Sequence, residues 1–174
     1  MKTLRYFFVA ALAMVVGNAF AADVTDELTW QALGLDGTTN QYKDYSGIKL
    51  TSTAVYAGQM SSGGGTNGGK YIQLRTSNSN AGIITTTSGG KLKSVTITFN
   101  AATTDRSIDI YGKNEAYAAA TDLYDADKQG TKLATIAANA DSKTLTVDGD
   151  YTFVGLKSAN GAIYVDKIEI TWAA

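Results

Sequence analysis

The fold class is decided by one stretch of the chain, residues 91–99, which reads KLKSVTITF. Polar and apolar side chains alternate along it and β-branched residues are frequent, which is the pattern of a half-buried β-strand. Because successive side chains of a strand point to opposite faces, we expect Val95, Ile97 and Phe99 to face a core. Leu92, together with the serine and threonines of the stretch, is expected to face away from it.

Similar runs recur on both sides of this stretch at the short spacing that is typical of β-sandwiches. We expect residues 71–75 and 82–86 to pair, residues 34–47 to form turns, and residues 115–120 to form one helical turn or a folded loop. About ten strands are predicted in all, the others at residues 26–30, 49–57, 107–111, 131–136, 143–147, 151–157 and 162–172.

These strands predict one all-β domain, a two-sheet antiparallel β-sandwich of jelly-roll type. The first and last strands are expected to be adjacent. Trp30 and Trp172 end apolar strands near opposite ends of the domain, so we assign both to the core or its rim. The predicted core consists of Val95, Ile97, Phe99, Ile108, Ile110, Phe153, Ile168 and Ile170.

The first residues of the chain predict export. Two basic residues, Lys2 and Arg5, precede an apolar run at 6–16, and Ala19-Phe20-Ala21 supplies the small residues of a cleavage site. We therefore predict a signal peptide at residues 1–21 and a β-sandwich domain at residues 22–174. The apolar run is too short to cross a bilayer, which takes roughly 20 residues of helix, so no membrane insertion is expected after cleavage. The expected destination is extracellular, the cell surface or the periplasm.

The composition of the exported part excludes several function classes. The chain has neither histidine nor cysteine, which rules out Ser-His-Asp and Cys-His centres and removes the usual zinc ligands. Without Lys2 and Arg5 there remain 13 basic and 16 acidic residues, a net charge of −3, which argues against nucleic acid and anionic membranes as partners. Paired carboxylates could still form a glycosidase centre, but no motif establishes one. We predict that the protein is not an enzyme.

The end of the strand series carries a family resemblance. Residues 150–158 read DYTFVGLKS and residues 161–172 read GAIYVDKIEITW. These strands, together with residues 93–111, resemble the jelly-roll, galactose-binding-like domains of secreted and surface proteins of Gram-negative gut anaerobes. Such domains are accessory modules, similar to carbohydrate-binding modules, beside polysaccharide-degrading or surface-attached partners. The resemblance covers nearly the whole exported chain and implies the same fold, with carbohydrate binding as the expected function.

The resemblance also implies a structural calcium ion. An acidic residue that enters the last strand of such domains ligates calcium together with oxygens near the first strand, and Asp166 holds the matching place. Asp26 or Glu27 could supply the partner, although Asp166 could instead be a solvated strand residue. The acidic loop at 122–130 partly matches a calcium-loop pattern, but Ile136 stands where a glutamate is needed. We favour a plain polar loop there.

A sugar site needs an aromatic ring beside groups that can bond hydroxyls. The alternative for each tyrosine is a half-buried packing residue at an edge. The candidates lie in the loop after the first strand, in the central hairpin and in the loop at 113–130, and they are Tyr42, Tyr45, Arg75, Asn78, Asn80, Tyr117 and Tyr124.

We therefore predict a secreted non-catalytic binding module, with carbohydrate on an extracellular or cell-surface polymer as its partner. A structural or adhesive domain that contacts a surface protein, or acts as a spacer, is the main alternative, and an enzyme of unknown type is a third. A glycan module predicts an exposed ring beside polar groups, whereas an adhesive domain predicts a flat patch or an unpaired sheet edge. The chain ends two residues after Trp172, so it could be the leading domain of a longer protein.

Overall fold

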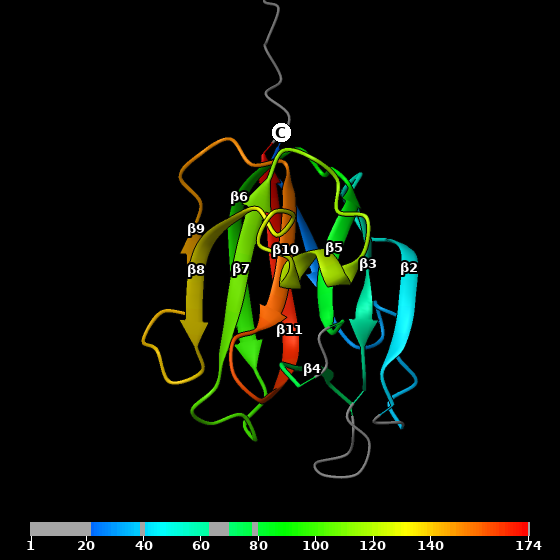
Figure 1. Cartoon of the computed structure of the whole chain (residues 1–174). Coiled ribbons are helices and arrows are strands. Elements are labelled where there is room, and N and C mark those ends of the chain that lie inside the picture. Colours follow the sequence, from blue (N-terminus) through cyan, green and yellow to red (C-terminus); the bar gives the residue numbers. More distant parts are fainter. Residues whose placement is uncertain (1–21, 39–40, 63–69, 78–79, 174) are drawn as a thin grey trace, which may run out of the picture.

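The computed structural model describes residues 22–38, 41–62, 70–77 and 80–173. The predicted signal peptide and Asn78 lie outside these residues. None of the helices in the described part of the chain is long and apolar enough to cross a membrane. The strands of the described part (Figure 1) are β1 (Val24–Leu28), β2 (Lys43–Lys49), β3 (Val55–Met60), β4 (Ile72–Arg75), β5 (Gly82–Thr87), β6 (Lys91–Phe99), β7 (Ser107–Lys113), β8 (Thr131–Ala137), β9 (Thr144–Thr146), β10 (Phe153–Ser158) and β11 (Ala162–Ala173), and a 3₁₀ helix, η2 (Ala120–Tyr124), lies between β7 and β8.

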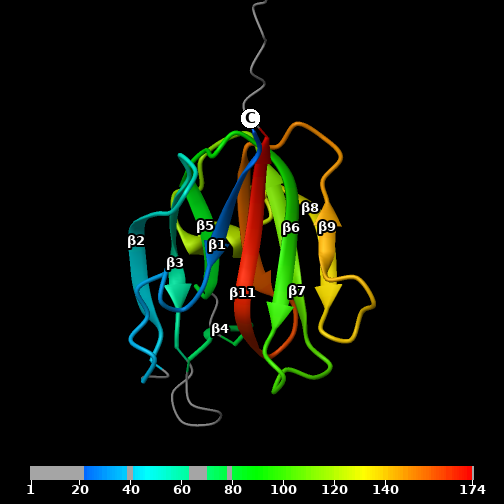
Figure 2. The same ribbon diagram turned by 180° about the vertical axis from the view of Figure 1, so that it is seen from behind.

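The strands form two antiparallel sheets that pack face to face (Figures 1 and 2). The five-stranded sheet has the order β1-β11-β6-β9, and β4 pairs with the first residues of β11. The six-stranded sheet has the order β2-β3-β5-β10-β7-β8. The predicted two-sheet antiparallel β-sandwich is confirmed. The predicted adjacency of the first and last strands is confirmed too, because β1 pairs with β11 from Val24 opposite Trp172 to Leu28 opposite Ile168.

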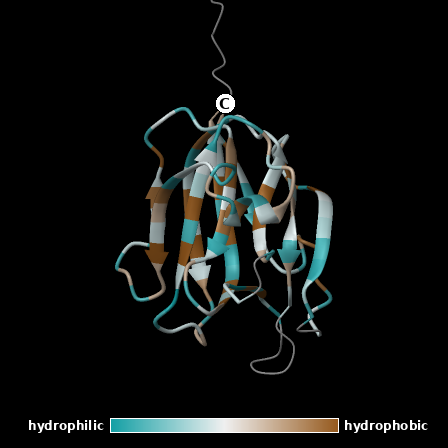
Figure 3. Ribbon diagram, viewed as in Figure 1, coloured by the Kyte–Doolittle hydropathy of each residue, from teal (hydrophilic) through white to brown (hydrophobic). Residues whose placement is uncertain are grey.

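The core lies between the sheets. Along β6 and β11 the buried residues alternate with exposed or half-exposed ones, so each strand turns one side inward. Figure 3 shows hydrophobic and hydrophilic residues following one another along the strands. The prediction is confirmed for six buried residues, which are Val95, Ile97, Ile108, Ile110, Ile168 and Ile170.

Two predictions about side-chain direction and one about burial need correction. Leu92 is fully buried, because a β-bulge opposite Thr171 and Trp172 adds one residue to β6 and reverses the alternation there. Phe99 is only half-buried. Phe153 is also half-buried, and it packs on the outer side of the six-stranded sheet because the alternation of β10 turns it away from the core.

Two strand predictions in the first half of the chain are wrong. The predicted strand at 49–57 is interrupted by the turn at 50–54, and β2 forms from residues that we expected to be a turn. The predicted pairing of 71–75 with 82–86 does not occur, because β4 joins the five-stranded sheet and β5 lies between β3 and β10 in the other. Alternation shows that a strand has a buried side, but it does not show which strand will be its partner.

A buried carboxylate joins the two sheets at the β1 edge. Asp26 is fully buried, and its Oδ1 accepts hydrogen bonds from the backbone N–H groups of Thr51 (2.9 Å) and Ser52 (2.7 Å). Its Oδ2 accepts from Ser52 Oγ (2.5 Å), Tyr56 OH (2.7 Å) and Trp172 Nε1 (3.1 Å). Burial alone would raise the pKa of Asp26, but these hydrogen bonds together hold it below its ordinary value. The network fixes the 50–54 turn and confirms Trp172 as a core residue.

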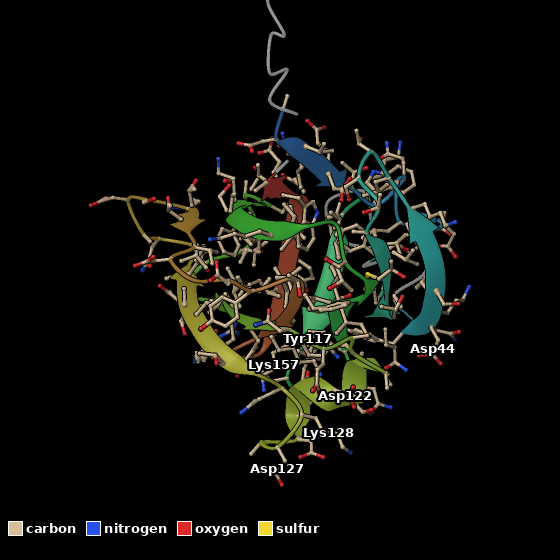
Figure 4. The ribbon with its side chains drawn as sticks, turned by 90° about the horizontal axis from the view of Figure 1, so that it is seen from above. Asp44, Tyr117, Asp122, Asp127, Lys128 and Lys157 are labelled. Carbon is tan, nitrogen blue, oxygen red and sulfur yellow. The ribbon has the colours of Figure 1, made fainter. Side chains whose placement is uncertain are left out.

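A segment that we call the strap, residues 114–130, covers the middle of the outer face of the six-stranded sheet (Figures 1 and 4). Its Tyr117 and Leu123 are 1% and 0% exposed and form a second hydrophobic cluster with Ile84 of β5. Two glycines of the sheet, Gly82 and Gly155, lie beneath these side chains. A Cβ atom on Gly82 or Gly155 would lie 2.6 or 2.5 Å from a methyl carbon of Leu123, so the strap can dock only on glycine at these positions.

The helical turn expected at 115–120 forms a few residues later, as η2. The carboxylate of Asp122 accepts hydrogen bonds from the backbone N–H groups of Ala118 (2.8 Å) and Ala119 (3.3 Å). This side chain satisfies the first free N–H groups and sets where the turn begins. The alanine-rich residues before it are therefore a folded loop, which was the other expectation for this segment.

Candidate functional site

An open crevice of about 400 Å³ lies at one edge of the sandwich. We call it the edge crevice, and its lining consists of residues 96–101, Thr103, Ala138 and Lys143. It exists because β9 is short. β9 pairs only with Ser94 to Thr96 of β6, and the last backbone bond runs from Ile97 N–H to the carbonyl of Lys143 (2.9 Å). The end of β6 therefore extends beyond β9 (Figure 2).

The edge crevice combines an aromatic ring with groups that can bond hydroxyls. Phe99 packs against the core and is half-exposed at the crevice. The hydroxyl of Thr98 is exposed on the same lining, and the ammonium group of Lys143 donates to the carbonyl of Ala140. Asn100 contributes an amide, of whose two N–H protons one is donated to Asp166 Oδ1 (2.7 Å). A ring beside a hydroxyl, an amide and an ammonium group is suited to a polyhydroxylated ligand.

Hydrogen bonds in the turn after β6 hold Asn100 and Thr103 in place. Asn100 Oδ1 accepts from the N–H of Ala102 (3.0 Å), and the N–H of Asn100 donates to the carbonyl of Tyr164 (3.0 Å). Thr103 Oγ1 donates to the same carbonyl (2.8 Å) and accepts from the N–H of Tyr164 (2.9 Å). The lining is therefore pre-organised on β11, which lowers the entropy that binding would cost.

The sequence missed the edge crevice because it placed Phe99 wholly in the core. The exposure of Phe99 depends on where β9 begins, and the strand predicted at 143–147 is three residues long, from Thr144 to Thr146. A signal was available in the polar residues 139–143, NADSK, which are poor candidates for extending a strand. The loop at 100–106 belongs to the stretch that carries the family resemblance, but we assigned it no role.

At the end of the sandwich near β4, Tyr42 lies within electrostatic range of two other predicted sugar-binding residues, Arg75 and Tyr124. Burial raises the pKa of Tyr42 while the nearby charge of Arg75 lowers it, and Tyr164 and Tyr124 are also close enough to affect it. The hydroxyl of Tyr42 is buried, and none of the described residues hydrogen-bonds it. Tyr164, which the sequence did not indicate, lies against Tyr71 with ring centroids 4.7 Å apart. This end is the alternative site.

The remaining predicted residues are scattered. The hydroxyl of Tyr117 donates to the carbonyl of Gln129 (2.7 Å), and with 1% exposure the ring belongs to the packing of the strap, so we no longer assign it to a ligand site. Tyr124 OH donates to the carbonyl of Ala81 (2.7 Å). Asn80, which precedes Ala81 in the chain, is exposed. Tyr45 is half-buried at the β2 edge, where it packs against the core.

A polar cluster that the sequence did not indicate lies beside the strap. Asp109 of β7 is 6% exposed and accepts from Thr135 Oγ1 (2.6 Å) and pairs with the ammonium group of Lys132 (2.7 Å). Lys157 of β10 lies over the ring of Tyr124 (4.6 Å) and donates to the carbonyl of Leu123 (2.6 Å). Burial lowers the pKa of Lys157. Because Lys157 bonds Leu123 and lies over Tyr124, both of the strap, we assign this cluster to holding the strap.

In the structure, each of the residues expected to bind calcium has different neighbours. Asp166 bonds the amide of Asn100, whereas Glu27 lies opposite Glu169 in the β1–β11 register. The oxygens of Asp26 are occupied by the network described above. Among the residues that the structure describes, no group of three or more acidic side chains is placed to hold a metal ion.

The second calcium hypothesis concerned the acidic loop at 122–130. There Asp125 pairs with Lys128 (2.9 Å) and accepts from the N–H of Asp127 (3.0 Å). Both contacts are local to the loop and satisfy the carboxylate without a metal ion. The plain polar loop that we favoured stays a prediction.

Comparison with known proteins adds little. No model of a known protein family matches the chain, and no curated protein matches it either. Among solved structures, it is similar to a low-affinity xylan-binding module, CBM86, from the xylanolytic gut symbiont Roseburia intestinalis, at 14% identity and a TM-score of 0.33, over 84% of this chain and 94% of that one. A similarity of this extent carries no argument, so the fold rests on the strands described above.

Proposed function

We propose that this domain is a non-catalytic carbohydrate-binding module and that the edge crevice holds the sugar. The observation that carries the proposal is that the half-buried Phe99 shares the crevice lining with Thr98, Asn100 and Lys143, whose side chains can bond hydroxyls. A pyranose has an apolar face that packs on an aromatic ring and a rim of hydroxyls that bond such groups. With the predicted signal peptide removed, the domain would meet its ligand on an extracellular or cell-surface polymer.

The crevice is suited to binding rather than to hydrolysis. Glycoside hydrolysis uses two carboxyl groups that face each other across the scissile bond. None of the residues that line the edge crevice is acidic. Asp166 reaches the lining only through Asn100, whose amide it accepts from, so it acts there as a positioning residue.

The β2 edge gives the adhesive alternative little support. This alternative predicts an open sheet edge to which another chain could add a strand. β2 is an edge strand of the six-stranded sheet, but it begins with Lys43, ends with Lys49 and is bulged between Tyr45 and Ile48. Charged ends and bulges are features that protect edge strands from such pairing.

The test is binding of the exported domain to a panel of plant, host and microbial polysaccharides, with and without calcium, by affinity electrophoresis. Phe99→Leu keeps the apolar volume but removes the ring, and we expect it to weaken binding about tenfold, in line with the contribution of one aromatic contact. Phe153→Leu is the matched control, since Phe153 is half-buried on the other sheet, and it should bind like the parent. Calcium dependence would support Asp166 as a metal ligand.

Two outcomes contradict the proposal. One is the absence of binding across the whole panel, when circular dichroism shows that the domain is folded. The other is binding that Phe99→Leu leaves unchanged, which would move the site away from the edge crevice.

A further inference from the structure

The outer face of the five-stranded sheet carries a row of hydroxyl groups that crosses four strands. In the strand registers Thr25 of β1 lies opposite Thr171 of β11, Thr171 lies opposite Ser94 of β6, and Ser94 lies opposite Thr146 of β9. All four side chains are exposed or half-exposed. Neighbouring strands are about 4.8 Å apart, so the row presents hydroxyls at a regular spacing.

The next row along the strands continues the array. Thr96 of β6 lies opposite Thr144 of β9 on one side and Glu169 of β11 on the other. The hydroxyls of Thr96 and Thr144 are 2.9 Å apart, as are those of Thr25 and Thr171 in the first row. Each such pair shares one proton and keeps a second proton and further lone pairs, so it can still donate to and accept from a ligand.

This face is open, in contrast to the outer face of the other sheet. Figure 2 shows β1, β11 and β6 side by side, with no described segment across them. The strap closes the opposite face with apolar side chains, whereas here the outward positions carry hydroxyls and charges. A hydroxyl-rich face of this kind forms no second core and stays available to a ligand.

The array is continuous with the edge crevice. Thr96 and Thr98 line the crevice and also belong to the outer face of β6. A ligand held in the crevice therefore reaches the second hydroxyl row at Thr96 and can extend from there across the outer face. The charges along this path are balanced, because Lys93 is 2.6 Å from Asp23, Lys167 is 3.0 Å from Glu169, Lys143 lines the crevice and Glu27 lies opposite Glu169. This balance gives an acidic ligand no advantage over a neutral one. The net charge of the exported chain, −3, disfavours an acidic ligand.

We infer that the domain binds a neutral polysaccharide as an extended chain, with one sugar in the edge crevice and the following sugars across the hydroxyl rows of the five-stranded sheet. This inference rests on the proposed function, since the crevice anchors the chain. Single hydrogen bonds to exposed hydroxyls exchange with water and contribute little each. Affinity should therefore grow with the number of sugars, and a chain with a regular repeat matches a regular array.

The experiment compares chain lengths and variants by isothermal titration calorimetry. The probes are di- to hexasaccharides and the parent polymers of xylan, mannan and β-glucan, with polygalacturonate as the acidic counterpart. The test variant is Thr171→Val with Ser94→Ala, which removes two hydroxyls of the row and keeps similar volumes. Thr87→Val is the matched control, because Thr87 is an exposed threonine at the end of β5 in the other sheet.

We expect the affinity of the parent to rise with chain length for one neutral series and to be weaker for polygalacturonate. The double variant should bind the hexasaccharide about tenfold more weakly, in line with the loss of two hydrogen bonds, and the disaccharide like the parent. Thr87→Val should change neither.

The inference is overturned if affinity stops rising at the disaccharide, or if the double variant binds every length like the parent. In either case Phe99→Leu would still weaken binding, so the proposed function would stand. If no sugar of any length binds the folded parent, the proposed function fails and this inference fails with it.

Discussion

The two outer faces of the sandwich differ, because the strap covers one and the other is open. Both faces are nevertheless formed by the same kind of antiparallel strand. The outward positions of the six-stranded sheet include Ile84, Tyr111 and two glycines, and the strap closes over them with Tyr117 and Leu123. The outward positions of the five-stranded sheet are rich in threonine, serine and charged residues and stay open. Backbone pairing is antiparallel in both sheets, so the side chains at outward positions make the difference.

This contrast separates stability from function. An apolar outer face gains free energy by being covered and becomes a second core. A hydroxylated outer face gains little from being covered, so it can serve as a binding surface. Substitutions on the covered face should therefore change the free energy of unfolding, and substitutions on the open face should change binding.

The largest effect is expected at the centre of the strap. Leu123→Ala removes a fully buried side chain that contacts both strap and sheet, and we expect the free energy of unfolding to fall by about 2 to 5 kcal/mol. Urea denaturation measures it. A loss below about 1 kcal/mol would show that the strap is only loosely docked, and the contrast between the faces would fail.

The hydrogen-bond network of Asp26 lies between the sheets. A substitution of Asp26 therefore tests the core independently of the two outer faces. The pKa of Asp26 lies below its ordinary value of 3.8, so its stabilising effect is complete above about pH 4 and is lost as the pH falls through the lower value in the folded protein. Asp26→Asn should lower the free energy of unfolding at pH 7 by about 2 kcal/mol.

Urea denaturation of the parent and of Asp26→Asn between pH 7 and about pH 2 checks this prediction. The variant should depend less on pH than the parent in the acid range. Equal slopes for the two proteins would show that other carboxylates govern acid unfolding.

A smaller effect is expected where the strap meets the sheet. Gly155→Ala places a Cβ atom 2.5 Å from Leu123 Cδ2, which should cost about 1 to 3 kcal/mol because the strap must shift. The double variant with Leu123→Ala removes this shortest contact, and the nearest remaining atom to the added methyl group is Tyr117 Cζ at 3.0 Å. The combined loss should therefore be clearly smaller than the sum of the two single losses, and an additive result would contradict the contact.

The smallest effect is expected on the open face. Thr25→Val should change the free energy of unfolding by no more than about 0.5 kcal/mol, since the side chain is exposed and bonds only Thr171. The same denaturation experiment measures it. A loss comparable to that of Leu123→Ala would mean that the open face is structural.

Alternation and the short spacing of the strands were sufficient to predict the sandwich and β6, and the expected jelly-roll type predicted that the first and last strands are neighbours. Alternation failed where the answer depends on a distant partner. β4 and β5 look like a hairpin locally, but they separate into different sheets. The turn at 50–54 is held by Asp26, about 25 residues earlier in the chain, and no local pattern indicates it.

The candidate site was predicted less well for a related reason. Tyr42, Arg75 and Tyr124 were chosen as aromatic or polar loop residues, and Tyr42 lies within electrostatic range of the other two. Phe99 was assigned to the core, because alternation predicts its direction correctly but not the length of the strand beside it. Its exposure follows from the three-residue β9, and strand ends are the feature that sequence patterns define least sharply.

The most direct test of the central claim is an NMR titration of the ¹⁵N-labelled domain with the neutral oligosaccharide that binds best. The account predicts saturable shifts for the backbone amides of Thr98, Phe99, Asn100 and Lys143, followed by Ser94 and Thr171 as the chain becomes longer. Shifts confined to Tyr42, Arg75 and Tyr124 would place the sugar at the β4 end instead and contradict the assignment of the edge crevice.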